Sequence, residues 1–163
     1  MAQKEKFLKI LSPIEEQIID ALEPVFAMEN CELVDIKIGG SKVNPSLLLY
    51  VDKPSLGELG ALSRLVSDTL DVANNEAGWF AGAYHLELSS PGLDRPLTKK
   101  SHFMKAVREM VRVKTAQGTR KEILQEAHED RGICLEQEPK WVAWQEIQDA
   151  RVIYRFPKSS HRR

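Results

Sequence analysis

A nine-residue run at positions 89–97, SSPGLDRPL, leaves the backbone little conformational freedom near the middle of the chain. Pro91-Gly92 supplies the fixed φ and the positive φ that a type II turn requires, and Pro96 pushes Arg95 toward an extended conformation. A flexible linker would instead be rich in Gly and Ser without such restraints. The run therefore predicts a stiff connector at residues 91–98, and we take its members Ser89, Ser90, Pro91, Gly92, Asp94, Arg95 and Pro96 as an interdomain motif.

A connector at this position divides the 163 residues into two small domains, which is a division that this length allows. We predict an N-terminal domain over residues 12–90 and a C-terminal domain over residues 99–157. Residues 158–163 are polar and basic with no apolar anchor, and they are predicted to form a mobile tail.

The N-terminal domain begins with a helix signature. Ser12-Pro13-Ile14-Glu15 matches a capping box with Pro at the first helical position, and apolar residues follow at helical spacing. Pro24 falls inside this pattern and removes a backbone donor. We therefore expect a kink there or an early end of the helix near Glu23.

The rest of this domain predicts a small sheet and a second helix. Residues 32–38 alternate apolar and polar side chains, residues 47–52 are more continuously apolar and so more central, and residues 84–88 alternate again. A second capping box at residues 55–58 opens the second helix, and residues 72–83 are predicted to form a loop. The order helix, strand, strand, helix, strand predicts an α+β sandwich with both helices on one face of a three-stranded sheet.

The C-terminal domain shows short strand patterns with little helix. Breaks that contain Gly or Pro separate five such segments, at residues 110–115, 122–127, 132–136, 141–144 and 151–156. Five short strands favour a small β-barrel, because closure removes the exposed sheet edges.

Charge is distributed unevenly between the two halves. Residues 1–96 hold 8 basic and 15 acidic side chains, a net charge of −7, whereas residues 97–163 hold 15 basic and 9 acidic side chains, a net charge of +6. The C-terminal half is therefore the half suited to contact with phosphates.

The positive charge is densest around the first strands of the C-terminal domain. Our candidates for binding RNA or a ribonucleoprotein are Arg95, Lys99, Lys100, Lys105, Arg108, Arg112, Lys114, Arg120 and Lys121. Clusters of this kind neutralise backbone phosphates without reading sequence. The alternative is a solvated barrel rim. For Arg95, a structural role in the turn is favoured over a phosphate contact.

Several functional classes are not supported by the sequence. The longest strongly apolar run, residues 47–51, is too short to cross a bilayer, and no export signal is recognised, so we expect a cytoplasmic protein. Cys31 and Cys134 have no metal-binding or redox spacing and are interpreted as reduced thiols. No metal site and no cofactor are predicted.

Catalysis is not predicted either. The nearest approach to a Ser-His-Asp set brings together His85, Ser89 and Ser90, with Asp94 as the acid. A GxSxG motif is absent, and a strand would separate His85 from Ser89 by about 13 Å. We therefore expect a protein that is not an enzyme. A small hydrolase, the weakest alternative, would lose turnover on Ser90→Ala.

The order of several motifs resembles the RimP family of bacterial ribosome maturation factors. The motifs are SSPGLDRPL itself, Cys31-Glu32-Leu33-Val34-Asp35, Leu49-Tyr50-Val51-Asp52, Ser63-Arg64 within a helix that reaches Leu70-Asp71, and, more weakly, Val111-Arg112-Val113 and residues 147–152. The resemblance covers the chain from about Ile14 to its end.

This resemblance implies a non-catalytic assembly factor. It implies an α+β N-terminal domain followed by an SH3-like, Sm-like barrel, and a monomer that binds the immature small (30S) ribosomal subunit. The implied partners are 16S rRNA and ribosomal protein S12, with docking mainly through the barrel. The alternative is an Sm-like RNA-binding regulator that is not tied to the ribosome and that could form a ring.

Overall fold

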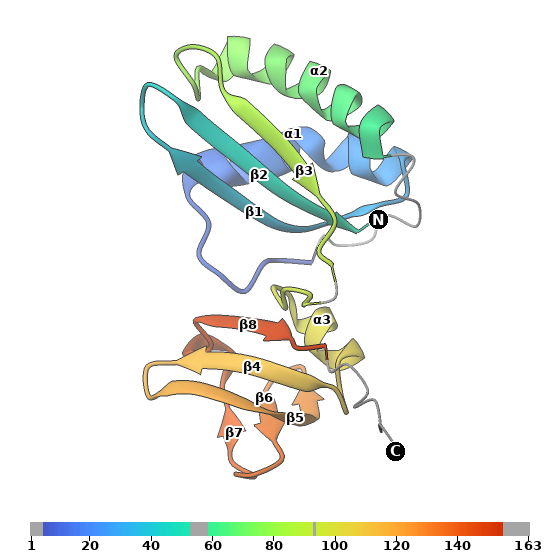
Figure 1. Cartoon of the computed structure of the whole chain (residues 1–163), viewed down its shortest axis with the longest axis vertical. Coiled ribbons are helices and arrows are strands. Elements are labelled where there is room, and N and C mark those ends of the chain that lie inside the picture. The colour runs from blue at the N-terminus through green and yellow to red at the C-terminus, as the bar shows by residue number, and fades with distance from the viewer. Residues whose placement is uncertain (1–4, 53–58, 93, 155–163) are drawn as a thin grey trace, which may run out of the picture. The chain divides into compact units, whose positions relative to one another are not determined.

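The computed structural model describes residues 5–52, 59–92 and 94–154 of the chain (Figure 1). These residues divide into two compact units. One unit is Ile10–Pro91. The other unit is Gly92–Arg163 together with Met1–Lys9, so the first residues of the chain belong to the same unit as its C-terminal half.

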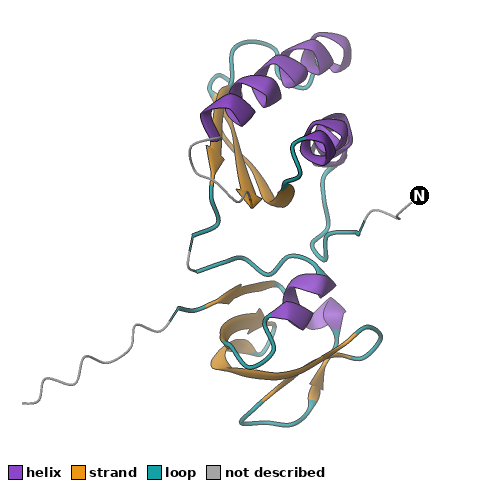
Figure 2. Cartoon of the chain, turned by 90° about the vertical axis from the view of Figure 1, so that its right-hand side faces the viewer, coloured by secondary structure: helices purple, strands orange, loops and turns teal. Residues whose placement is uncertain are grey.

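The N-terminal unit is built from two helices and a three-stranded sheet. Its elements in chain order are α1 (Pro13–Met28), β1 (Glu32–Gly40), β2 (Pro45–Asp52), α2 (Leu59–Ala77) and β3 (His85–Ser89). The strand order is β1-β2-β3, with β1 antiparallel and β3 parallel to β2. Figure 2 shows both helices on the same side of this sheet. The predicted α+β class is confirmed.

Helix α1 starts where its capping box indicates. The backbone N–H of Glu15 donates to Ser12 Oγ at 3.2 Å, and the Ser12 N–H donates to Glu15 Oε1 at 3.0 Å. The prediction of an early end near Glu23 is wrong, because the helix continues past Pro24 to Met28. Val25 and Phe26, which follow the proline, are buried, and their burial stabilises the last turn despite the missing backbone donor.

Strand β2 lies at the centre of the sheet, as its continuous apolar run predicted. Its connection to β1 requires glycine at the last residue of that strand. Gly40 has a φ of +77°, and a Cβ there would lie 2.2 Å from the carbonyl oxygen of Asn44. No other residue fits this approach of two backbone segments.

Helix α2 is longer than the sequence indicated. The predicted loop at residues 72–83 is wrong in its first half, because the helix runs to Ala77. The reason is tertiary: the Asn74 side chain accepts from the Phe80 N–H at 2.9 Å and donates to the Phe80 carbonyl at 3.2 Å, which fixes the chain just after the helix. The predicted capping box at residues 55–58 lies outside the described residues.

The aromatic residues after α2 fold back onto the unit. Trp79 Nε1 donates to Gln17 Oε1 at 2.7 Å, and the rings of Phe80 and Tyr84 stack with centroids 4.9 Å apart. Burial, together with a 3.0 Å hydrogen bond to the Asp71 carboxylate, raises the pKa of Tyr84 to about 12.

The C-terminal unit is one sheet with a short helix beside it. Its elements are α3 (Lys100–Lys105), β4 (Met110–Thr115), β5 (Gly118–His128), β6 (Gly132–Leu135), β7 (Trp141–Val142), a 3₁₀ turn (Trp144–Glu146) and β8 (Asp149–Val152). The strand order is β7-β6-β5-β4-β8, and all neighbours are antiparallel. Within the described part of the chain, these pairings run from β7 to β8 without closing into a ring.

The five strands nevertheless surround one core. Its buried members come from every part of the unit: Leu97, Phe103, Ala106, Val111, Val113, Leu124, Ile133, Leu135, Trp144 and Ala150. Leu8 from the start of the chain also packs against this cluster. The unit is therefore a single layer of sheet bent around a shared apolar interior.

The observed elements of this unit correct the prediction in several details, and β5 and β8 begin earlier than expected, at Gly118 and Asp149. Helix α3 was not predicted, although Phe103 on it is fully buried in the core. The predicted strand at residues 141–144 ends at Val142, because Trp144 turns inward. The Trp144 ring lies 5.3 Å from that of Phe103, and its Nε1 donates to the Glu129 carbonyl at 2.9 Å.

Candidate functional site

The second half of the SSPGLDRPL run is an integral part of the C-terminal unit. The Val152 N–H donates to the Arg95 carbonyl at 2.8 Å, and the Leu97 N–H donates to the Ala150 carbonyl at 2.9 Å. Pro96 forms an antiparallel bridge with Arg151 between these two bonds. Residues 95–97 therefore extend the sheet as a short edge segment beside β8, where the absent N–H of Pro96 is tolerated.

Other members of the run have local structural roles. Gly92 has a φ of +71°, as the predicted turn requires. The Asp94 carboxylate accepts a hydrogen bond from the Tyr154 N–H at 3.1 Å, and Ser89 Oγ donates to the Ser90 carbonyl at 3.2 Å. The backbone of Arg95 is bonded to β8, whereas its side chain lines a pocket.

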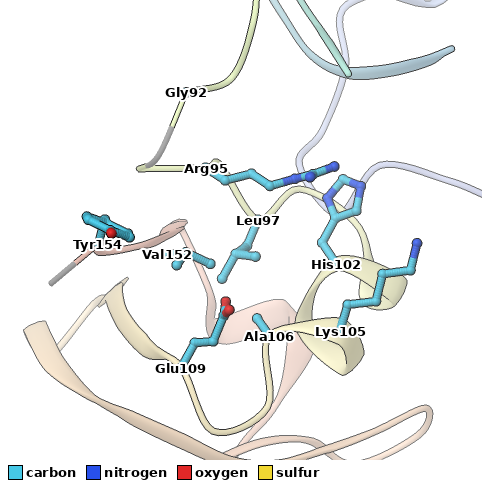
Figure 3. Close-up of a pocket in the computed structure, with 9 residues that line it drawn as sticks. All are labelled: Gly92, Arg95, Leu97, His102, Lys105, Ala106, Glu109, Val152 and Tyr154. Carbon is cyan, nitrogen blue, oxygen red and sulfur yellow. The ribbon is translucent and has the colours of Figure 1, made fainter. Parts of the chain in front are cut away.

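This pocket has a volume of about 310 Å³ and lies wholly within the C-terminal unit (Figure 3). Figure 3 shows the Arg95 side chain extending toward the His102 ring, with Lys105 on the same wall. The Glu109 carboxylate enters from the opposite wall. The remaining lining residues are Gly92, Leu97, Ala106, Val152 and Tyr154. Two of the predicted basic candidates, Arg95 and Lys105, are thus brought together.

His102 is fixed in this wall by the backbone that precedes α3. Its Nδ1 accepts hydrogen bonds from the N–H groups of Thr98 at 3.1 Å and Lys99 at 3.2 Å. An accepting Nδ1 places the proton of the neutral imidazole on Nε2. His102 as a whole is 5% exposed, so it is a buried part of this wall.

Two predicted candidates near α3 make contacts within the unit. Lys99 Nζ lies 4.8 Å from the centroid of the Phe7 ring. Lys100 Nζ donates to the Glu129 carbonyl at 2.9 Å and lies 5.7 Å from the centroid of the Trp144 ring. Arg108, by contrast, has an exposed side chain on a backbone with a φ of +80°.

Basic residues gather on the face of β4, β5 and β8 that points away from the core. Val111 and Val113 of β4 are buried, so the alternate positions Arg112 and Lys114 face outward. Arg112 lies directly opposite Lys121 of β5 on one side and opposite Arg151 of β8 on the other. Opposite residues in an antiparallel pair share a face, so these three cations form one row across three strands.

Arg120, another predicted candidate, belongs to the other face. It lies opposite Val113, its Nε is 2.5 Å from Glu122 Oε2, and its Nη1 is 3.6 Å from Glu138 Oε2. The Glu122 side chain is 5% exposed. Burial alone would raise the pKa of Glu122, but the hydrogen bonds from Arg120 and from the Gln137 N–H outweigh it and lower this pKa. Nε and Nη1 of Arg120 therefore face carboxylates of its own unit, while its Nη2 is shielded from solvent without a hydrogen-bond partner among the described residues.

Sequence reasoning missed two components of this unit. Arg151 was not included among the basic candidates. The alternation of β4 indicates that Arg112 faces outward, and a basic residue on a neighbouring strand could have been sought as its partner. The segment before α1 was also not assigned: Glu5 accepts hydrogen bonds from the N–H and the hydroxyl of Ser101 at 2.8 and 2.6 Å, and the Leu8 N–H donates to the Thr98 carbonyl at 2.8 Å.

The described residues contain no cluster of three or more His, Cys, Asp or Glu side chains able to hold a metal ion. Within the same residues, no helix is both long and apolar enough to cross a membrane.

The described fold and site define a two-unit α+β protein with a basic strand face in its second unit. Residues 21–94 match the family model of the RimP N-terminal domain. In an alignment of 112 residues that covers 65% of the chain, it is 34% identical to "Ribosome maturation factor RimP" of Mycobacteroides abscessus. The chain spans 57% of that relative.

Residues 21–94 thus carry a RimP N-terminal domain, in agreement with the resemblance carried by the motifs. The matched domain reaches from within α1 to Asp94, so it includes the whole three-stranded sheet and the first part of the SSPGLDRPL run.

Proposed function

We propose that this protein is a ribosome maturation factor that binds the immature small (30S) ribosomal subunit. The observation that carries the proposal is the RimP N-terminal domain at residues 21–94, together with a relative that bears the name of a ribosome maturation factor. In this proposal the protein acts in the cytoplasm as a monomer, and its partners are 16S rRNA and ribosomal protein S12.

The C-terminal unit is proposed to be an SH3-like, Sm-like barrel that provides most of the docking surface. Five antiparallel strands bent around one core support this assignment. So do the basic side chains on its outer face, because a ribonucleoprotein presents many phosphates. The acidic N-terminal half, with its net charge of −7, is proposed to face basic ribosomal proteins instead.

The proposed mechanism uses binding energy alone. The factor binds one local arrangement of the unfinished subunit more tightly than the others, and so raises the population of that arrangement. It leaves when the mature arrangement no longer offers the same contacts. No covalent step and no cofactor are part of this mechanism. The stiff connector predicted at residues 91–98 would serve it by limiting the orientations that the two domains sample.

A sucrose gradient tests the proposal directly. The full chain, mixed with free small subunits and with complete ribosomes at low ionic strength, is expected to travel with the small subunits only. Reversing acidic charges on α2, at Asp68 and Asp71, should weaken this association less than reversing Lys114 and Lys121. Absence of the protein from the small-subunit fractions would contradict the proposal.

The same material separates this function from the alternative, an Sm-like RNA-binding regulator. A regulator would bind RNA equally well without small-subunit particles, and a ring would show a mass several times that of one chain. A monomer that binds particles more tightly than isolated RNA is the result expected for the maturation factor.

A further inference from the structure

The row formed by Lys121, Arg112 and Arg151 is electrostatically unfavourable within the isolated unit. Its members stand on adjacent strands, which are about 4.8 Å apart, so the backbone positions of three cationic residues lie within about 10 Å. Like charges directly opposite one another destabilise a sheet. A counter-charge is provided by Asp149, whose Oδ2 lies 3.9 Å from Arg112 Nη2, beyond hydrogen-bond distance.

The two arginines of the row also carry unused hydrogen-bond donors. In the part of the chain that the structure describes, Nε of Arg112 and Nε of Arg151 are shielded from solvent and have no hydrogen-bond partner. A shielded donor of a charged group without an acceptor costs free energy. An oxyanion placed over the row would accept these bonds and would reduce the repulsion at the same time.

The residues around the row indicate what kind of anion fits. The neighbouring outward positions are Met110 and Lys114 on β4, Thr119 and Ile123 on β5, and Asp149 on β8. None of these residues is aromatic, whereas protein interfaces are anchored by Tyr and Trp, and base recognition in single strands uses stacking on aromatic rings. The face therefore offers charge and planar guanidinium donors, but no anchor for a protein and no platform for a base.

We propose that the row Arg112, Lys121 and Arg151 binds successive phosphates of an RNA backbone, independently of sequence. This inference rests on the proposed function and specifies which surface meets the RNA. It also sorts the predicted candidates: Arg112 and Lys121 belong to the phosphate site, Arg151 is added to it, and Arg120 is excluded because it pairs with Glu122 and Glu138 on the opposite face.

The test measures binding of the full chain to a fluorescent oligouridylate at several salt concentrations. Each phosphate contact in a single strand contributes about 0.7 to the slope of log affinity against log salt. The triple variant Arg112→Gln/Lys121→Gln/Arg151→Gln should therefore reduce the magnitude of this negative slope by about 2. A control that removes three charges elsewhere, Lys42→Gln/Arg131→Gln/Lys140→Gln, should leave the slope unchanged. A cooperative thermal unfolding transition is required of each variant as evidence that it is folded.

A second variant tests the guanidinium contacts specifically. Arg112→Lys/Arg151→Lys keeps the charge but removes both Nε donors, so it should keep most of the salt slope and lose affinity. In the unmodified chain, the Nε–H resonances of Arg112 and Arg151 should move when oligouridylate is added. An unchanged slope in the triple variant would overturn the inference, and so would Nε–H resonances that stay fixed at saturating RNA. Tighter binding of polyglutamate than of oligouridylate would assign the row to an acidic protein instead.

These outcomes are distinguishable from failure of the proposed function. Suppose that the unmodified chain travels with small subunits while the triple variant keeps its RNA salt slope. The assignment of the row as a phosphate site is then wrong, and the proposed function stands. If the unmodified chain ignores small subunits but the row binds oligouridylate as described, the maturation function is wrong and the phosphate site stands.

Discussion

Arg120 and Glu122, two residues apart on β5, form an ion pair on the core-facing side of the sheet, with Arg120 Nε 2.5 Å from Glu122 Oε2. Glu122 Oε1 also accepts a hydrogen bond at 2.8 Å from the N–H of Gln137, which follows β6. The pair therefore ties the middle of β5 to the chain beyond the neighbouring strand. A buried carboxylate in such a position depends on both partners for its stability.

We expect Glu122→Gln to lower the free energy of unfolding by about 1–3 kcal/mol at neutral pH, because the amide cannot replace the charged bond to Arg120. The folded pKa of Glu122 is lowered, so its ionisation stabilises the fold above the unfolded pKa of about 4.3. This stabilisation is lost as the pH falls through the folded pKa. The difference in the free energy of unfolding between the variant and the unmodified protein should therefore become smaller at acid pH.

Urea unfolding at a series of pH values measures this difference. Glu126→Gln, at an exposed position of the same strand, is the control and should shift the free energy by no more than about 0.5 kcal/mol at any pH. A Glu122→Gln effect of constant size down to the acid limit would mean that shape, and not charge, makes Glu122 important.

Elements with strong local signals could be predicted from the sequence. The capping box of α1 and the alternation of β4 each specify a structure through neighbours within a few residues, and both elements begin where predicted. The end of α2 could not be predicted in this way, since it depends on Asn74 binding the backbone of Phe80. Helix α3, with six residues, is too short to show a helical period and is stabilised by burial of Phe103.

The candidate site was predictable in composition but not in arrangement. Clustering in sequence identified Arg112, Arg120 and Lys121 together, yet strand alternation places Arg120 on the opposite face. Arg151 joins the row only through the register between β4 and β8, which brings together residues 39 positions apart. Such a pairing is fixed by the shared core and not by any local pattern.

The SSPGLDRPL run is expected to contribute to stability as well as to connect the domains. Leu97 is 5% exposed and belongs to the core of the C-terminal unit. Leu97→Ala removes three buried carbon atoms and should destabilise the protein by about 2–5 kcal/mol. Val72→Ala, at a position 64% exposed on α2, should change stability by less than about 0.5 kcal/mol. Chemical denaturation compares the two, and equal effects would mean that Leu97 acts only as part of a connector.

Glu5 is expected to hold the first residues of the chain on the C-terminal unit. Its carboxylate accepts from the N–H of Ser101 in the first turn of α3, where the N-cap residue Lys99 makes no side-chain cap hydrogen bond. Glu5→Ala should therefore cost about 0.5–2 kcal/mol, as loss of a helix cap does. It should also speed hydrogen exchange at the amides of Ser101 and Leu8.

The exchange measurement has an internal reference, because amides of β4 that bond within the sheet should keep their protection in the Glu5→Ala variant. Glu5→Gln, which retains an acceptor oxygen, should restore most of the protection at Ser101. Slow exchange at Ser101 and Leu8 in Glu5→Ala would show that the segment is held by the packing of Leu8 and not by the carboxylate.

Gly132 at the start of β6 is expected to be the glycine least tolerant of substitution in the C-terminal unit. It has a φ of +107°, and a Cβ there would lie 1.9 Å from the carbonyl oxygen of Val142 on β7. Gly118 provides a matched comparison, since it has a φ of +131° but open space around the added Cβ. Gly118→Ala should cost about 1 kcal/mol or more through backbone conformation alone. Gly132→Ala adds a clash between two paired strands, so it should cost about 1–3 kcal/mol more. Thermal unfolding of the two variants measures the difference directly, and equal destabilisation would mean that β7 can move away from β6 without loss of stability.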